Sequence, residues 1–193
     1  MLSFGRYLWR RARKSRFGSD TRGVTAIEFA MIMPVFLLGM LCVMETGFMM
    51  FTEYVLQTSV QEAARLVRTG QAQKDGLNAT TFKTKVCRIA GTIMNCTGKV
   101  TVYMKAEATF NSLSTIPSYL DVGAKKADGT AGLNNFQCGG PSQAVALIAT
   151  YDWDFVFPYF MSYFGNMNSN KTRRLGAYAM FRNEPFPAVS PTC

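Results

Sequence analysis

An apolar segment near the N-terminus constrains this chain more than any other feature. Residues 24–51 read VTAIEFAMIMPVFLLGMLCVMETGFMMF. A helix needs roughly 20 apolar residues, each rising about 1.5 Å, to cross a bilayer. Glu45 lies about 28 Å beyond Ala26 along such a helix, and Glu28 lies near its start, so both charges fall at the edges of the hydrocarbon core. The sequence therefore predicts one transmembrane helix over residues 24–50.

The positive charge of the chain is concentrated before this segment. The net charge is +9, and residues 1–23 hold seven basic side chains against one acidic side chain, or +6. The other 14 basic and 11 acidic residues add only +3. Basic residues beside a span mark its cytoplasmic side. We expect a basic cytoplasmic leader over residues 1–23, a periplasmic remainder after the inner-membrane span, and no nucleic-acid partner.

Two export signals offer alternative interpretations of this start. A secretory signal peptide has an apolar region of about 7–15 residues followed by a small-residue cleavage site. Here the apolar region is longer, and no Ala-x-Ala follows it before Phe48. The Arg10-Arg11 pair lies too far upstream for a twin-arginine signal. A permanent anchor agrees better with the length of the segment.

The helix is predicted to continue beyond the bilayer, over residues 51–70. Apolar residues recur there at helical spacing, and polar residues mark the opposite face. The apolar set is Leu56, Val60, Ala63, Val67 and Gly70, and the polar set is Gln57, Gln61, Arg65 and Arg68. Gly70 suits the end of the helix. Inside the span, Pro34 cannot donate a backbone hydrogen bond, so we expect a kink there.

Residues 71–193 are predicted to form a periplasmic α+β head. A helix is expected at about 80–94, and three runs rich in Val, Tyr, Phe and Thr predict strands at 99–110, 144–157 and 173–182. An insertion rich in Gly, Ser and Asn, residues 111–143, separates the first two strands and is either an irregular excursion or a mobile loop. We expect a small antiparallel sheet packed on the long helix.

Four of the five cysteines lie in the predicted periplasmic part, where disulfides persist. They allow three pairings, of which we favour Cys87–Cys96 with Cys138–Cys193. The first pair requires the helix to end and turn back before Cys96. Cys42 lies in the span as a small apolar residue. With no histidine and no Cys-x-x-Cys spacing, we expect no metal site and no other cofactor.

Asp152 and Asp154 form the most suggestive polar pair for an enzyme. Two residues apart on a strand, they share one face and could bind calcium or act as an acid–base pair. We favour a solvated strand face over a reactive site. No phosphate-binding glycine loop and no nucleophile elbow occurs in the sequence, so we expect no catalytic residue and no enzymatic activity.

The junction between leader and helix reads Arg-Gly-Val-Thr-Ala-Ile-Glu-Phe over residues 22–29. A polar basic leader ends in glycine, and an apolar helix follows with a glutamate at its fifth position. This resembles the junction of type IV prepilins, where a membrane-embedded peptidase cuts after the glycine. The resemblance implies a cut between Gly23 and Val24, with Glu28 and Phe29 in subunit assembly.

Physical chemistry makes this spacing intelligible. A small residue lets the chain extend into a protease cleft. Cleavage leaves an α-ammonium on Val24 at the start of an apolar helix, and burying an isolated charge in a filament is very costly. Pairing that ammonium with Glu28 of a neighbouring subunit would satisfy both charges. The alternative is a carboxylate that only interacts with the helix dipole.

A wider pattern is similar to the TadE-like family of the tight-adherence (Flp) pilus system. Its pattern of Gly-x-x-Ala-Val-Glu-Phe-Ala, then Leu-Pro, then Ala-Ala-Arg before Thr-Gly is matched over roughly residues 22–70. Ile27 stands for the usual Val, and Met33 for the Leu before Pro34. The match is weaker near the C-terminus, at residues 181–186.

This resemblance implies a minor pilin or pseudopilin that acts by assembly. Its expected partners are a prepilin peptidase, other pilins or pseudopilins, inner-membrane pilus assembly proteins and the lipid bilayer. One alternative is an uncleaved membrane scaffold of the same machinery. A third is an anchored periplasmic ligand-binding domain, for which the 111–143 insertion is the place to look for a pocket.

Overall fold

The computed structural model describes residues 23–91, 94–167, 171–187 and 193. The chain divides into an N-terminal unit, residues 1–41, and a C-terminal unit, residues 42–193. Helix α1 (Val24–Arg68) contributes to both units. The described part of the N-terminal unit is almost entirely α1, so the rest of the fold belongs to the C-terminal unit. The predicted leader, apart from Gly23, lies outside the described residues.

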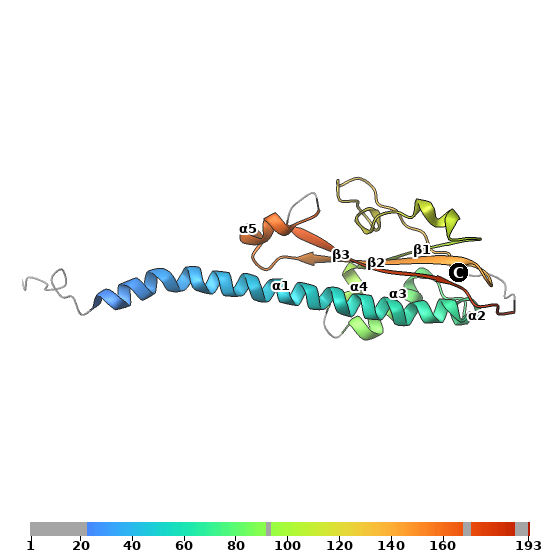
Figure 1. The fold of residues 1–193 in the computed structure, drawn as a ribbon, viewed down its shortest axis with the longest axis horizontal. Helices are drawn as coiled ribbons and strands as arrows, with labels where there is room; N and C mark the ends of the chain where they lie inside the picture. The colour runs from blue at the N-terminus through green and yellow to red at the C-terminus, as the bar shows by residue number, and fades with distance from the viewer. Residues whose placement is uncertain (1–22, 92–93, 168–170, 188–192) are drawn as a thin grey trace, which may run out of the picture. The chain divides into compact units, whose positions relative to one another are not determined.

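A three-stranded antiparallel sheet is the centre of the C-terminal unit (Figure 1). Strand β2 (Ala144–Asp154) lies between β1 (Val100–Glu107) and β3 (Thr172–Arg182). The three predicted strands are confirmed, with small differences at their ends. β2 is buried on both faces over most of its length, which explains why its sequence is a continuous apolar run.

Helices cover one face of this sheet. The C-terminal part of α1 buries Leu56, Val60, Ala63 and Val67 in the main core, as the spacing predicted. α3 (Ala79–Ala90) adds Phe82 to the same core. The short helices α2 (Gln71–Lys74) and α4 (Cys96–Lys99) connect these elements. The result is an α+β unit in which the long helix packs against the sheet.

The 111–143 insertion covers the other face of the sheet (Figure 1). It contains two short 3-10 helices, η3 (Asn111–Thr115) and η4 (Tyr119–Asp121). Val122 is fully buried against Tyr103 and Ile148, and Leu113 packs on the alanines at the start of β2. Of the two predicted alternatives, the irregular excursion is therefore correct. Its apolar side chains form a third layer.

Both disulfides are present in the favoured pairing. Cys87 pairs with Cys96, and Cys138 pairs with Cys193. The first bond forms because α3 ends at Ala90, earlier than the residue 94 predicted, and the chain turns back. The second ties the C-terminal residue to the end of the insertion. Cys42 is free and partly buried.

Strand β3 is an edge of the sheet, and α1 protects it. The Gln57 side chain accepts a hydrogen bond from the Tyr178 backbone N–H (3.1 Å) and donates one to the Tyr178 carbonyl (2.9 Å). Gln61 donates a second hydrogen bond to that carbonyl (3.2 Å). Unpaired strand edges invite association with other chains. Side chains on the polar face of α1 therefore form hydrogen bonds with the backbone N–H and carbonyl of Tyr178, as a neighbouring strand would.

Gly70 follows α1 and reverses the chain. It adopts the left-handed conformation with φ 78°, which suits glycine because other residues are strained there. A Cβ at this position would lie 2.7 Å from the Phe186 ring. Beside it, Glu184 donates its backbone N–H to the Arg68 carbonyl and pairs its carboxylate with the Arg68 side chain. The C-terminal segment is thus docked on the end of α1.

Candidate functional site

The predicted cleavage junction lies at the very start of α1. Val24 is the first residue of the helix, and Gly23 directly precedes it. Residues 23–30 are all exposed. A Cβ placed on Gly23 would meet nothing within 4 Å. The described structure thus gives no packing reason for glycine at this position, and a larger residue there would not disturb the fold.

Glu28 is an isolated carboxylate in this helix. It is the only charged residue between Val24 and Met44. It is the fifth residue of α1, beyond the first turn, where the helix dipole has its main effect. Glu28 is exposed, as is its neighbour Phe29, and among the described residues its carboxylate has no hydrogen-bond or ion-pair partner. The dipole alone therefore accounts poorly for a charge in an apolar surface.

The surface around Glu28 is strongly apolar. Large hydrophobic side chains of the N-terminal unit are exposed on every side of the helix; among them are Val24, Ile27, Phe29, Met31, Ile32, Val35, Phe36, Leu37, Met40 and Leu41. Among the described helices, α1 alone is long and apolar enough to cross a membrane. A helix that is apolar all round suits a bilayer or a packed bundle. The helix continues through Pro34, where the kink stays a prediction.

A second acidic residue of α1, Glu45, is buried rather than exposed. Its side chain is only 6% accessible, and Oε1 accepts a hydrogen bond from the Val156 backbone N–H. Its other oxygen, Oε2, is buried and has no hydrogen-bond partner among the described residues. From the sequence we expected only a charge at the membrane edge. No local pattern relates residue 45 to residue 156, so the contact was not predictable.

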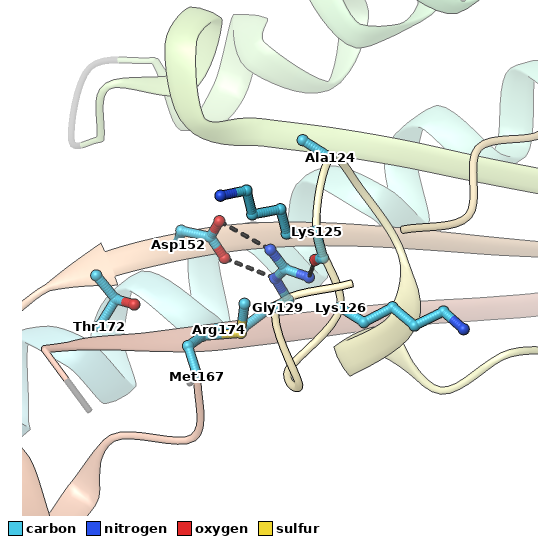
Figure 2. A pocket seen from close by; sticks show the side chains of 8 residues that line it. All are labelled: Ala124, Lys125, Lys126, Gly129, Asp152, Met167, Thr172 and Arg174. Carbon is cyan, nitrogen blue, oxygen red and sulfur yellow. Dashed lines mark hydrogen bonds and ion pairs between the residues drawn. The ribbon is translucent and has the colours of Figure 1, made fainter. Parts of the chain in front are cut away.

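Asp152 and Asp154, the candidate acid–base pair, each have a cationic partner. Asp152 lies opposite Arg174 across the β2–β3 ladder, with Nε–Oδ1 2.6 Å and Nη2–Oδ2 2.9 Å (Figure 2). Asp154 forms an ion pair with Lys99. The hydrogen bond to Asp154 raises the pKa of Lys99 above its ordinary value, although burial opposes the rise. Both carboxylates are thus engaged in structural pairs.

Arg174 also binds the insertion to the sheet. The side chain is 4% exposed, and its Nη1 donates to the carbonyls of Val122 and Lys125 at 2.7 Å and of Leu120 at 3.2 Å. A guanidinium provides five donors in a fixed plane, which matches one carboxylate and several carbonyls. Sequence reasoning missed this residue because Asp152 is 22 positions away and the carbonyl partners are about 50 positions away.

A surface hollow of about 440 Å³ lies beside this pair (Figure 2). The insertion, which the ligand-binding alternative singled out as the place to look for a pocket, contributes Lys125, Lys126 and Gly129 to its wall. Within the described part of the chain, Arg174 and Asp152 already bind each other there. The hollow therefore gives little support to the ligand-binding alternative.

The described structure thus defines a pilin-like α+β protein with one long N-terminal apolar helix. Residues 23–65 match the family model described as TadE, TadE-like protein. This segment, which contains Gly23, Glu28 and all but the last three residues of α1, is similar to the TadE-like family. Searches of curated proteins and of solved structures found no match.

The family match is confined to residues 23–65, so it concerns the N-terminal part of the chain. The similarity implies a role in assembly of the tight-adherence pilus, in a family that is generally non-catalytic. It also implies association with components of that pilus system. The long apolar helix indicates a single membrane anchor.

Proposed function

We propose that this chain is a minor pilin or pseudopilin of a tight-adherence pilus, cut by a prepilin peptidase between Gly23 and Val24. One observation supports the proposal above all others. α1 begins at Val24 with an exposed apolar surface in which Glu28 is the only charge before Glu45. A lone carboxylate in such a surface requires a cation once the surface is covered.

The proposed cation is the new α-ammonium of a neighbouring subunit. Cleavage after Gly23 exposes the amine of Val24, which would be buried when apolar helices pack side by side. Glu28 lies one helical turn beyond this amine in its own chain. An ammonium aligned with Glu28 of the next subunit neutralises both charges and sets the axial offset between neighbours. Phe29 and the other exposed apolar side chains supply the packing surface.

The proposed topology follows from charge and from the disulfides. The leader, residues 1–23, has a net charge of +6 by sequence and is assigned to the cytoplasm. The C-terminal unit contains both disulfides, which persist in an oxidising compartment such as the periplasm. In this arrangement residues 24–50 span the inner membrane, residues 51–70 extend the helix, and residues 71–193 form the periplasmic head.

Replacing Glu28 with Gln is expected to abolish or strongly reduce piliation. The substitution keeps the shape of the side chain and removes its charge, so the ammonium of the neighbour is left unpaired. Loss of one partner of a buried ion pair costs about 3–5 kcal/mol. Pili are counted by electron microscopy in a strain whose only copy of the gene carries the substitution.

Glu53→Gln provides the matched control. Glu53 lies on the same helix and is exposed in the C-terminal unit, so its loss should leave pilus number unchanged. Immunoblots of the membrane fraction show whether both variants accumulate equally. Normal piliation with Glu28→Gln would refute the pairing and favour the alternative of an uncleaved scaffold, which uses α1 only as an anchor.

A further inference from the structure

The connection between β2 and β3 displays aromatic side chains to solvent. We call residues 155–164 the aromatic loop; six of its ten residues are aromatic. It contains α5 (Pro158–Met161) and η5 (Ser162–Phe164). Tyr159 is 85% exposed and Tyr163 is 93% exposed, while Phe160 and Phe164 are about half exposed. A cluster of exposed apolar rings marks an interaction surface.

The backbone of the aromatic loop is held in a defined place. Phe155 and Met161 are buried in the main core, and Arg173 donates a hydrogen bond from Nη1 to the Phe164 carbonyl (2.9 Å). Val156 donates its N–H to the buried carboxylate of Glu45 on α1. The exposed rings are therefore presented by an anchored segment. The hydrogen bond to the buried Glu45 therefore fixes the aromatic loop beside one turn of α1.

That level lies near the outer end of the proposed membrane span, five residues before Met50. Glu45 lies 21 residues after Val24, which is about 30 Å along a helix and thus about one hydrocarbon thickness. Near this level, the exposed side chains of Met44, Phe48 and Phe51 line a shallow apolar hollow of about 290 Å³. A loop fixed to Glu45 lies where lipid headgroups begin.

We propose that the aromatic loop inserts its rings into the headgroup region of the bilayer and holds the C-terminal unit against the membrane before assembly. The inference rests on the proposed function in that α1 must span the bilayer. Tyrosine rings favour this interface because one end is apolar and the other is polar. No acidic residue occurs between Phe155 and Arg174, and Lys171 and Arg173 follow the loop, which suits an anionic phospholipid surface.

Quenching of an added tryptophan by brominated lipid tests this placement. The full chain with Trp9→Phe is reconstituted into vesicles of phosphatidylethanolamine and phosphatidylglycerol, with Trp153 kept in every variant. Tyr163→Trp adds an indole to the loop. Bromine placed close to the headgroups should cause loss of the emission added by this indole, and bromine near the bilayer centre should cause a smaller loss.

Two further variants complete the experiment. Phe110→Trp lies beyond the end of β1, at a half-exposed position unrelated to the loop, and should not be quenched. Phe36→Trp lies in the proposed span and should be quenched most by the deep bromine. If Phe36→Trp is quenched and Tyr163→Trp is not, the proposed insertion of the loop is wrong, whereas the proposed membrane span of α1 is supported. If Phe36→Trp is also unquenched, the membrane span itself is wrong.

The alternative is that the exposed rings of the aromatic loop contact a second copy of the chain instead of lipid. In that case the emission of the Tyr163→Trp indole would shift to shorter wavelength at high protein density. Brominated lipid would not quench this emission at either depth. This result would overturn the lipid assignment. Quenching that is independent of the protein-to-lipid ratio supports it.

Discussion

Replacing Arg174 with Met is expected to lower the free energy of unfolding of the C-terminal unit by about 3 kcal/mol. Methionine fills a similar volume but donates no hydrogen bond. Asp152 then loses its bidentate partner, and the carbonyls of Val122 and Lys125 lose their donor. The insertion would detach from the outer face of the sheet. Denaturant unfolding in mild detergent measures the change, followed by Trp153 fluorescence in a chain that carries Trp9→Phe.

Lys99→Met is the matched control for that experiment. It also removes one cation from a carboxylate on the same face of β2, but Asp154 is 59% exposed and can be hydrated. Exposed pairs contribute about 0–1 kcal/mol. Arg174→Met should therefore cost several times more than Lys99→Met. Equal and small losses in the two variants would show that Arg174 does not hold the insertion in place.

Gly70→Ala is expected to destabilise the C-terminal unit by about 3 kcal/mol. The left-handed conformation costs a residue with a Cβ roughly 1–2 kcal/mol, and crowding in a packed site costs about 1–3 kcal/mol. The new methyl group would lie 2.7 Å from the Phe186 ring, so the C-terminal segment would have to move. The same denaturant titration measures this loss.

Gly47→Ala is expected to raise the stability of the protein, in contrast to Gly70→Ala. Gly47 lies inside α1, and a Cβ there meets nothing within 4 Å. Alanine is favoured over glycine in a helix interior by about 1 kcal/mol. The two Gly→Ala variants should thus shift stability in opposite directions. A neutral or stabilising effect of Gly70→Ala would contradict the close approach of Phe186.

Local sequence patterns predicted most of the fold. The spacing of Leu56, Val60, Ala63 and Val67 gave the buried face of α1, because helical periodicity is a property of neighbouring residues. The three strands were found in the same way, although β2 ends at Asp154 rather than at residue 157. There the backbone N–H of Val156 turns to Glu45, and Pro158 begins α5.

The interactions that sequence reasoning missed are those between distant residues. Arg174 reaches carbonyls about 50 positions earlier, and Glu45 reaches Val156 across 111 positions. The order of the insertion depends on Val122 and Leu113 meeting the outer face of the sheet, which no pattern within the insertion indicates. In contrast, the prediction for Gly23 and Glu28 depends only on spacing at the start of one helix, and it stays a prediction.

The central claim is that Val24 becomes the N-terminus of the mature chain, and mass spectrometry of the intact protein tests it directly. The protein is expressed in membranes with and without the candidate peptidase, and its terminus is read in each case. We predict a chain that begins at Val24 only when the peptidase is active, and a full-length chain when Gly23 is replaced by Phe. Since Gly23 has open space around it, this substitution should leave the fold intact. A full-length N-terminus in the presence of active peptidase would contradict the account.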